Sequence, residues 1–501
     1  MEVAIASIGL ATAQGSNHDI SKGATPRAPE PWPWPLNEWS TSRSCRPAVG
    51  VGANLSGVAR WQALIQLALK DCFGDQVPSP QTPLFIASCN GSAGDCNAES
   101  WSAAFDSVAL LAGTPWAGQR LPVFSSSCNS GLHALYAARQ VLMSGQADEA
   151  VVLAADILSR SNQDNFEVLR VLTDSPIVPW QPNSTGFVLG EAAVVLRLVH
   201  ENDGLSRTRL VGLALANELT RNDGLPRVLE RLSTANPQLL LGQGTGPVET
   251  DESELAAFQG CLSGEIPLAT ALVHFGHTLG ASGLLATALA ASIQQDPQAL
   301  SSLAMPAASA SDGRTLHVRS SGENGLSSNA HAPGNILISS RALNGSCAAA
   351  IVGNVNNGLV QQDEVWDQGR TMKKAWHEAA PTGPLMNTLL RQLAEEAPRC
   401  RPVDPPDVLL VRLEEPLAPP PEARIGERIL PSAVLEMTPG FVSQLVARCW
   451  GFAGPALCLV GNSIVHNAQW DLRSAFEATG LVMSQIDLRG TGDKREIVWN
   501  N

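Results

Sequence analysis

The sequence predicts an α/β protein built from more than one packed unit. Its 501 residues are more than one ordinary core needs, which favours several units or an internally duplicated fold. Apolar residues make up 44% of the chain and charged residues 16%, a balance typical of a folded protein with a large core. Residues 121–155 follow a strand, turn, helix, strand pattern, which indicates strands connected by helices.

The N-terminal elements follow from local patterns. Val3–Leu10 is predicted as a buried strand. The Pro- and Trp-rich residues 29–39 cannot form a helix or a central strand, so we expect an ordered surface loop there. Apolar residues recur at helical spacing from Val58 to Cys72, and the short apolar run Leu84–Ala87 is predicted as a strand.

The most informative unit places a cysteine at a turn. Leu121–Phe124 is predicted as a strand, Ser125–Asn129 as a tight polar turn, Ser130–Ser144 as a helix that ends before a glycine, and Glu149–Ala155 as a buried strand. Cys128 lies in this turn, just before the helix.

A thiol at the start of a helix has a specific chemistry. The positive end of the helix dipole and the free N–H groups are expected to lower the pKa of Cys128 and to favour its thiolate. A thiolate there can take an acyl group from a thioester, while the same N–H groups stabilise the oxyanion. Taken alone, SSSCNSG is a weak signal and favours a buried, inert cysteine.

Charge and composition exclude several classes of function. The net charge of −14 argues against a nucleic-acid partner or an anionic membrane surface. The N-terminus lacks the pattern of a secretory signal and no apolar run is long enough for a bilayer, so we expect a cytoplasmic protein. Ten scattered cysteines without CxxC pairs suggest neither structural zinc nor a disulfide framework, and no metal or cofactor is indicated.

Several ordered motifs carry a family resemblance. They are IASIGLATAQG at the start, CNSGLHAL around Cys128, VVLAAD ending at Asp156, GFVLGEAA, and HFGHTLGASG around His277. Together they resemble the β-ketoacyl synthases of fatty-acid and polyketide assembly, within the thiolase superfamily, over about residues 1–355. The resemblance implies a thiolase-like fold of α/β/α/β/α layers, in which two similar halves meet at the active site.

Departures from the family pattern are also informative. Gln243, in QGTGPVETDESE, stands where the family has the first histidine of its HGTGT motif, although Asp251 and Glu254 remain in register. Leu272 replaces the usual lysine five residues before His277, and the gating stretch is altered to RALNGSCAAAIV, from Arg341 to Val352.

The resemblance implies roles for particular residues. Cys128 is the expected nucleophile, and His277 and Gln243 are the expected hydrogen-bond donors to a thioester carbonyl. His274 is expected at the substrate pocket, where it compensates for the missing histidine, or else is a satisfied structural histidine. Leu343 and Asn344, in the altered gate, are expected to bind substrate.

Three functions remain open from the sequence. The first is an acyltransferase that loads Cys128 from an acyl carrier protein, through its phosphopantetheine arm, or from acyl-CoA. The second is a decarboxylative β-ketoacyl synthase that uses Cys128, His277 and Gln243. The third is a non-catalytic partner subunit that resembles a chain-length factor. The resemblance also implies a homodimer, or a heterodimer with a related ketosynthase.

The C-terminal part of the chain changes character. Pro384–Glu396 is predicted as an amphipathic helix and Arg401–Arg424 as a Pro-rich linker. Ile429–Asn462 then resembles the segment that leads to the nucleophile turn, with Asn462 and Ser463 in place of the cysteine. We expect a truncated, degenerate repeat that ends near Arg489, in which His466 is structural.

These patterns divide the chain into four parts. Residues 1–204 are the half with the nucleophile turn, and 205–360 the half with the histidine motif. Residues 361–425 are the helix and linker, and 426–501 the truncated ketosynthase-like repeat.

Overall fold

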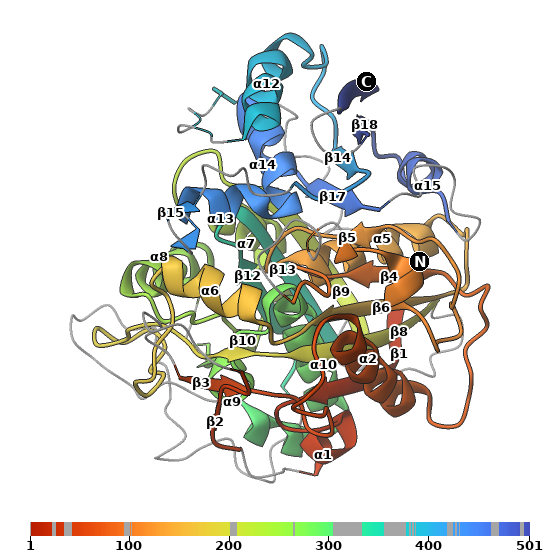
Figure 1. The fold of residues 1–501 in the computed structure, drawn as a ribbon. Coiled ribbons are helices and arrows are strands. Elements are labelled where there is room, and N and C mark those ends of the chain that lie inside the picture. Colours follow the sequence, from red (N-terminus) through yellow and green to blue (C-terminus); the bar gives the residue numbers. More distant parts are fainter. Residues whose placement is uncertain are drawn as a thin grey trace.

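A 14-stranded sheet runs through the molecule in the computed structural model (Figure 1). The structure describes residues 2–22, 27–34, 43–94, 101, 103–200, 208–263, 266–303, 333–354, 377–379, 382, 385, 387–417, 424–425, 428–429, 431–461, 470–490 and 495–500. Within these residues the sheet consists of three successive stretches, which we call the first sheet, the second sheet and the C-terminal sheet.

The first sheet has the strand order β5-β4-β6-β8-β1. β4 pairs in parallel with β5 and β6, while β8 pairs antiparallel with β6 and β1. The strands are β1 (Val3–Thr12), β4 (Leu84–Ala87), β5 (Val123–Phe124), β6 (Glu149–Asp156) and β8 (Ala192–His200). Strands predicted at the N-terminus and around the cysteine turn are therefore present.

The second sheet repeats this arrangement, with the order β11-β10-β12-β13-β9. Its pairings are parallel, parallel, antiparallel and antiparallel, the same succession as in the first sheet. A single register pair, Ala4 with Arg209, joins the two sheets. The strands are β9 (Thr208–Asn217), β10 (Leu239–Leu241), β11 (Leu268–Ala269), β12 (Ile336–Arg341) and β13 (Ser346–Asn354). The prediction that the fold has two similar halves is confirmed.

Helices complete five layers. α5 (Ser130–Met143) and α10 (Ser282–Gln295) lie between the two sheets, and their residues are almost all buried because they are covered on both sides. A Cβ on Gly131 would lie 2.8 Å from the Cβ of Leu284, so glycine permits this close crossing. The outer layers are α2 (Gly57–Phe73) on the first sheet, and α7 (Gly224–Leu232) with α8 (Val248–Cys261) on the second. The predicted α/β/α/β/α order is confirmed.

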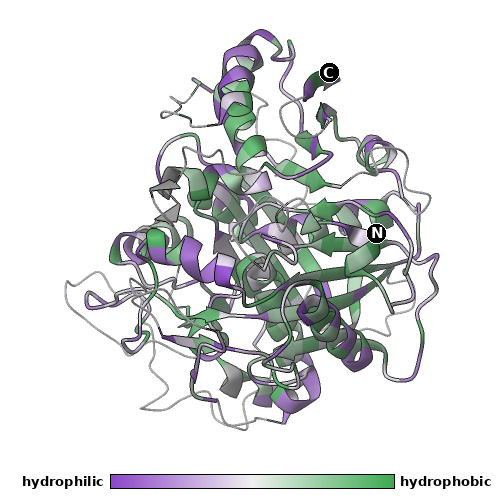
Figure 2. Cartoon of the chain, viewed as in Figure 1, coloured by the Kyte–Doolittle hydropathy of each residue, from purple (hydrophilic) through white to green (hydrophobic). Residues whose placement is uncertain are grey.

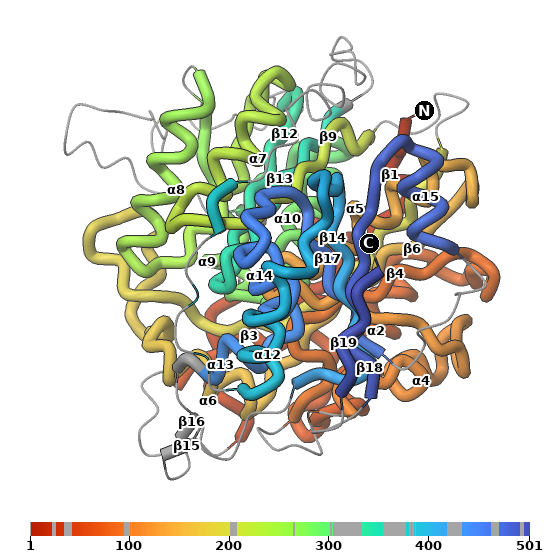
Figure 3. The backbone as a smooth tube through the Cα atoms, turned by 90° about the horizontal axis from the view of Figure 1, so that it is seen from above, coloured from red at the N-terminus to blue at the C-terminus, as the bar shows by residue number. Residues whose placement is uncertain are grey.

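The C-terminal sheet has the order β17-β14-β18-β19, and β17 pairs antiparallel with β5 of the first sheet. Its elements are β14 (Val408–Leu413), α14 (Pro439–Trp450), β17 (Ala456–Val460), α15 (Leu472–Ala478), β18 (Met483–Arg489) and β19 (Glu496–Asn500), which we call the C-terminal unit. Figures 1 and 3 show it in blue as one block beside the first sheet. The predicted helix before it is α12 (Thr388–Glu396).

One expectation for this region was wrong. The Pro-rich segment Arg401–Arg424 was predicted as a linker, yet it contains β14, an interior strand of the C-terminal sheet. The apolar run VLLVRL forms the strand, and the prolines lie on either side of it. The predicted repeat also involves Asn462, Ser463 and His466. These three residues lie outside the described residues.

The other described elements are short. Figure 2 shows apolar residues concentrated on the central strands and on the helices between them. No helix in the described ranges is both long and apolar enough to span a bilayer. The remaining elements are β2 (Glu30–Pro31), β3 (Ser44–Arg46), β7 (Leu189–Gly190), β15 (Arg424–Ile425), β16 (Arg428–Ile429), α1 (Asn17–Ser21), α4 (Ser107–Leu110), α6 (Arg160–Val168), α9 (Leu272–Phe275), α13 (Pro431–Met437) and four 3₁₀ segments, Ser233–Ala235, Leu279–Ala281, Pro297–Ser302 and Ala397–Arg399.

Candidate active site

The Cys128 turn connects β5 to α5. Ser127 has φ +54°, in the left-handed region, so the chain reverses sharply just before Cys128. The Ser130 hydroxyl lies 2.6 Å from the Ser127 carbonyl oxygen and 2.9 Å from the Ser126 nitrogen, whose N–H donates to it. The turn therefore holds its own shape, and it places Cys128 two residues before the first residue of the helix.

Burial dominates the electrostatics of Cys128. The side chain is 4% exposed, and burial together with the charge of Asp156 raises the pKa of its thiol to about 12. The expected lowering by the helix dipole is therefore wrong for this closed site. A partial charge at a helix end contributes roughly 1 kcal/mol, which is less than the cost of desolvating a thiolate. Cys128 is a thiol at neutral pH in this state.

Asp156 connects the loop after β4 to the histidine motif, and the Ser125 hydroxyl of the cysteine turn donates to the Cys89 carbonyl of that loop at 3.1 Å. Asp156 lies at the end of β6, is fully buried, and accepts hydrogen bonds from the Cys89 N–H at 3.0 Å and the Gly280 N–H at 2.8 Å. The Ser88 hydroxyl donates to it as well, at 2.8 Å. Burial raises the pKa of Asp156 to about 7 in spite of these bonds. One carboxyl thus joins loops from both halves beside Cys128.

His277 is held as a neutral donor. The Leu279 N–H donates to its Nδ1 at 3.1 Å, which leaves the ring proton on Nε2. Burial lowers the pKa of His277 to about 4, so the ring is uncharged at neutral pH. The imidazole stacks on the Phe187 ring, with centroids 4.6 Å apart, which fixes its orientation.

Among the described residues, the Gln243 side-chain amide is hydrogen-bonded through its oxygen only. Its Oε1 accepts from the Arg341 N–H at 3.0 Å, whereas its Nε2 is buried without a partner in the described part of the chain. A cavity of about 40 Å³ is lined by Gln243 and His277 together, and Leu272 also lines it. An unpaired buried donor is costly, so this geometry suits a ligand carbonyl.

The two acidic residues in register after Gln243 explain how its loop is built. Glu254 accepts from the Gln243 N–H at 2.8 Å and from the Gly244 N–H at 3.0 Å. Asp251 accepts from the Gly246 N–H at 2.9 Å. These carboxylates hold the backbone of the loop and do not line the cavity.

The other predicted substrate-binding residues lie apart from this cavity. His274 is on α9, and burial and the nearby charge of Arg46 lower its pKa to about 4. Leu343 is 50% exposed, while Asn344 is 4% exposed and accepts from the Ser346 N–H at 3.1 Å. Neither these three side chains nor Cys128 line the cavity shared by Gln243 and His277.

Sequence reasoning missed residues that tie the gate to the cysteine turn. The Asn129 side-chain amide donates to the Ser346 carbonyl at 2.7 Å, and His133 Nε2 lies 3.0 Å from the Ser346 hydroxyl. Ser346 starts β13, so the altered gate is fastened to the first turn of α5. Asn129 is the N-cap of α5 and His133 lies in its first turn, and their polar side chains were the sequence signal for this contact.

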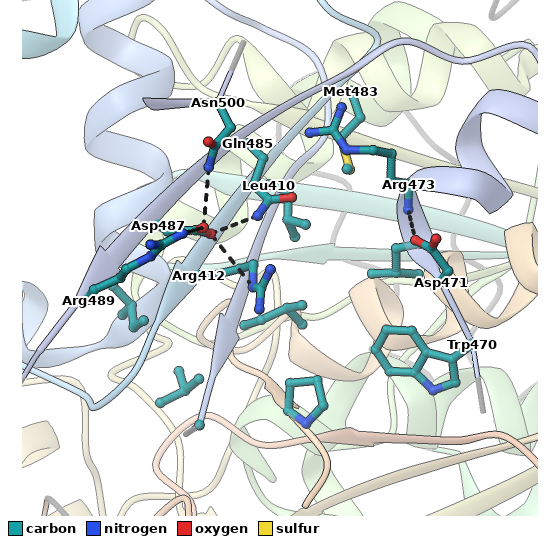
Figure 4. A pocket seen from close by; sticks show the side chains of 16 residues that line it. Leu410, Arg412, Trp470, Asp471, Arg473, Met483, Gln485, Asp487, Arg489 and Asn500 are labelled. Carbon is teal, nitrogen blue, oxygen red and sulfur yellow. Dashed lines mark hydrogen bonds and ion pairs between the residues drawn. The ribbon is translucent and has the colours of Figure 1, made fainter. Parts of the chain in front are cut away.

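A second, larger cavity belongs to the C-terminal unit (Figure 4). It measures about 460 Å³, and Arg412, Arg489, Gln485 and Asn500 surround Asp487 on one side of it. None of the predicted site residues lines it. This opening is therefore separate from the cysteine and histidine motifs.

Comparisons with known proteins agree with this fold. The chain is similar to a ketosynthase in complex with its chain length factor from Xenorhabdus doucetiae, at 17% identity and a TM-score of 0.53, over 70% of this chain and 98% of that one. A ketosynthase bound to a type II polyketide synthase acyl-carrier protein matches at 16% identity and a TM-score of 0.54, over 71% and 99%. No curated protein sequence matches the chain.

One similar structure covers nearly the whole chain. The PfaC keto synthase-chain length factor matches at 12% identity and a TM-score of 0.68, over 97% of this chain and 74% of that one. The fold is therefore the thiolase-like fold of the ketosynthases. Residues 121–203, which include Cys128, match the family described as Beta-ketoacyl synthase, N-terminal domain, so the resemblance predicted from the motifs is confirmed.

Proposed function

We propose that this protein is a ketosynthase-like acyltransferase that loads an acyl group onto Cys128 and passes it on. The observation that carries the proposal is that one buried carboxyl supports the loops beside both the cysteine motif and the histidine motif. Asp156 joins the Cys89 loop, which accepts a hydrogen bond from Ser125 of the cysteine turn, to the histidine loop, and His277 and Gln243 line one cavity. The thiol and the donors are the parts that acyl transfer requires.

The loading step exchanges one thioester for another. Cys128 Sγ bonds to the carbonyl carbon of the incoming thioester, the bond from that carbon to the carrier sulfur breaks, and the Cys128 thiol proton passes to the leaving carrier thiolate. Because the pKa of the Cys128 thiol is about 12, deprotonation must accompany attack rather than precede it. N–H groups at the start of α5 stabilise the oxyanion.

The proposed donor is an acyl carrier protein or an acyl-CoA. One similar structure is a ketosynthase in complex with its acyl-carrier protein, which supports the first choice. A phosphopantetheine arm carries its thioester at the end of a long, thin chain, as a thiol that is 4% exposed requires. We also propose association with a related ketosynthase, as the chain-length-factor complexes suggest.

A second function is favoured by one specific observation. Gln243 lines the same cavity as His277 and its buried Nε2 has no partner among the described residues, so two neutral donors are proposed to hold the carbonyl oxygen of a malonyl thioester while carbon dioxide leaves. Decarboxylative condensation by Cys128, His277 and Gln243 is therefore the alternative. The isosteric change Gln243→Glu, which replaces the N–H₂ group by an acceptor, is expected to lower decarboxylation by about 10²–10³-fold.

The loading proposal is tested by intact-mass spectrometry after incubation with a panel of acyl carrier-protein and acyl-CoA thioesters. Wild type is expected to gain the acyl mass, and Cys128→Ala is expected to gain none. Cys72→Ala is the matched control, because burial also raises the pKa of that thiol to about 12. Loading of the Cys128→Ala variant would contradict the proposal.

A malonyl carrier then separates the remaining functions. Release of carbon dioxide with an elongated product supports condensation, whereas transfer of the acyl group to another acceptor without such release supports acyl transfer alone. If wild type never gains an acyl mass across the panel, the non-catalytic partner function replaces both.

A further inference from the structure

The C-terminal unit repeats part of the first sheet around a local two-fold axis. Its pairings from β17 to β19 are parallel, parallel and antiparallel, as they are from β5 to β8. β17 pairs antiparallel with β5, Leu459 opposite Phe124 and Val460 opposite Val123. The edge of β5 is therefore already occupied, and a second chain cannot add a strand there.

The same unit contacts the cysteine turn directly. The Ser125 N–H donates to the Cys458 carbonyl at 3.0 Å, and the Ser127 hydroxyl lies 3.5 Å from the Thr438 hydroxyl. Between them, α14 approaches so closely that a Cβ on Gly440 would lie 2.6 Å from the Cα of Ser126. Three successive residues before Cys128 are thus supported from the C-terminal unit.

α14 also reaches the region of the gate. The Gln444 side-chain amide donates to Asn217 Oδ1 at 2.6 Å, and Asn217 pairs with Ser346 between β9 and β13. Arg448 Nε donates to the Glu218 carbonyl at 3.3 Å. One helix therefore contacts both the turn before Cys128 and the strands that carry the altered gate.

We propose that the C-terminal unit acts as a covalently attached partner that positions Cys128, with Gly440 as the positioning residue. The unit carries no part of the Gln243 and His277 cavity, so its contribution is to hold the turn and not to react. The expected effect on acyl loading rests on the proposed function. The expected effect on the position of the Cys128 thiol does not. The similar keto synthase-chain length factor structure, which covers 97% of this chain, supports a partner-like placement.

Gly440→Ala tests the proposal because helix propensity and packing predict opposite results. Alanine is the better helix former by about 1 kcal/mol, so α14 itself should tolerate it. The added methyl group would instead meet the backbone of Ser126, which cannot move without moving the turn. Gly260→Ala, in α8, is the matched control, because its Cβ would meet nothing within 4 Å.

Two measurements are made on each variant. Alkylation of Cys128 by iodoacetamide, mapped by peptide mass with the partly exposed Cys400 as internal standard, is expected to become several times faster in Gly440→Ala as the turn shifts. Acyl loading is expected to fall by about 10²-fold, the size of effect that a misplacement near 1 Å produces. Gly260→Ala should match wild type in both.

The outcomes decide the proposal separately from the function. Wild-type alkylation and loading rates in Gly440→Ala would overturn it. If wild type loads no acyl group at all, the proposed function fails, and the alkylation rates still decide whether Gly440 positions Cys128. If Gly440→Ala does not fold, Thr438→Val, which removes the hydroxyl contact to Ser127, must alkylate faster than wild type, and an unchanged rate would overturn the proposal.

Discussion

The first sheet and the C-terminal sheet share a strand order but differ in what covers them. In the first sheet, the face that carries Phe85, Val152 and Ala154 is apolar and is closed by α5 and α10. In the C-terminal sheet, the same face is covered at one end by α15 and opens elsewhere into the cavity of about 460 Å³. Arg412, Gln485 and Asp487 stand on that open face (Figure 4).

The difference shows what the second half of the fold contributes. α10 and the loops of Gln243 and His277 all come from the second half, and the C-terminal unit has no such half in the described residues. Without it, the repeated strands cannot bury an apolar face, and polar side chains take the exposed positions. The C-terminal sheet thus keeps its strand pairing and its contact with the cysteine turn.

Breaking the buried ion pair between Arg60 of α2 and Glu191 should give the largest effect. Glu191 accepts two bonds of 2.7 Å from Arg60, and both side chains are at most 1% exposed. Glu191→Ala leaves a buried guanidinium unpaired, so we expect the free energy of unfolding to fall by about 3–5 kcal/mol. Urea unfolding measures it. The control replaces both Arg60 and Glu191 by methionine, and it should lower the free energy of unfolding by less than Glu191→Ala does. An equal loss would contradict the explanation that the unpaired guanidinium is the cause.

Trp470→Ala tests how firmly the C-terminal unit is attached. The indole stacks on Phe85 of the first sheet, with centroids 5.0 Å apart, and is 7% exposed. Loss of this buried ring should cost about 3–4 kcal/mol in urea unfolding and should lower acyl loading of Cys128. Trp499→Ala, whose ring lies 6.0 Å from Trp450 within the same part of the chain, is the control and should leave loading unchanged.

Much of the fold could be predicted because its signals are local. The apolar runs at Leu84–Ala87 and Glu149–Ala155, and the turn between them, appear in the structure as β4, β6 and the Cys128 turn. β14 was missed since five apolar residues and one arginine among prolines carry little periodicity.

The site was less predictable because its geometry depends on residues far apart in the sequence. The Asp156 contact with Gly280 spans 124 residues, and no local pattern announces it. The direction of the Cys128 pKa depends on burial by all parts of the fold, whereas the sequence shows only the helix that follows it. The approach of Gly440 to Ser126 is likewise visible only in three dimensions.

The carboxyl of Asp156 should make the free energy of unfolding depend measurably on pH. Its pKa is about 7 in the folded protein and 3.8 as the reference, so the folded state binds the proton more tightly. The stability that protonated Asp156 contributes is complete below pH 3.8 and is lost as the pH rises to 7. The free energy of unfolding falls over this range by up to about 1.4 kcal/mol per pH unit.

Urea unfolding of wild type and Asp156→Asn between pH 5 and pH 8 measures this slope. Because His133 and His277 titrate in both proteins, only the difference between the two curves reports Asp156. Wild type should lose stability relative to the variant up to pH 7, and a constant difference would contradict the assignment.

Asp487 in the C-terminal unit should show the smallest effect, although at 2% exposure it is nearly as buried as Asp156 and Glu191. Its partners Arg412 and Arg489 have side chains 20% and 47% exposed and border the open cavity, so water can solvate them when the carboxylate is removed. We expect Asp487→Ala to cost about 1 kcal/mol in urea unfolding. A cost as large as that of Glu191→Ala would mean that the cavity is closed in solution, since only a closed face leaves the two guanidinium groups without water.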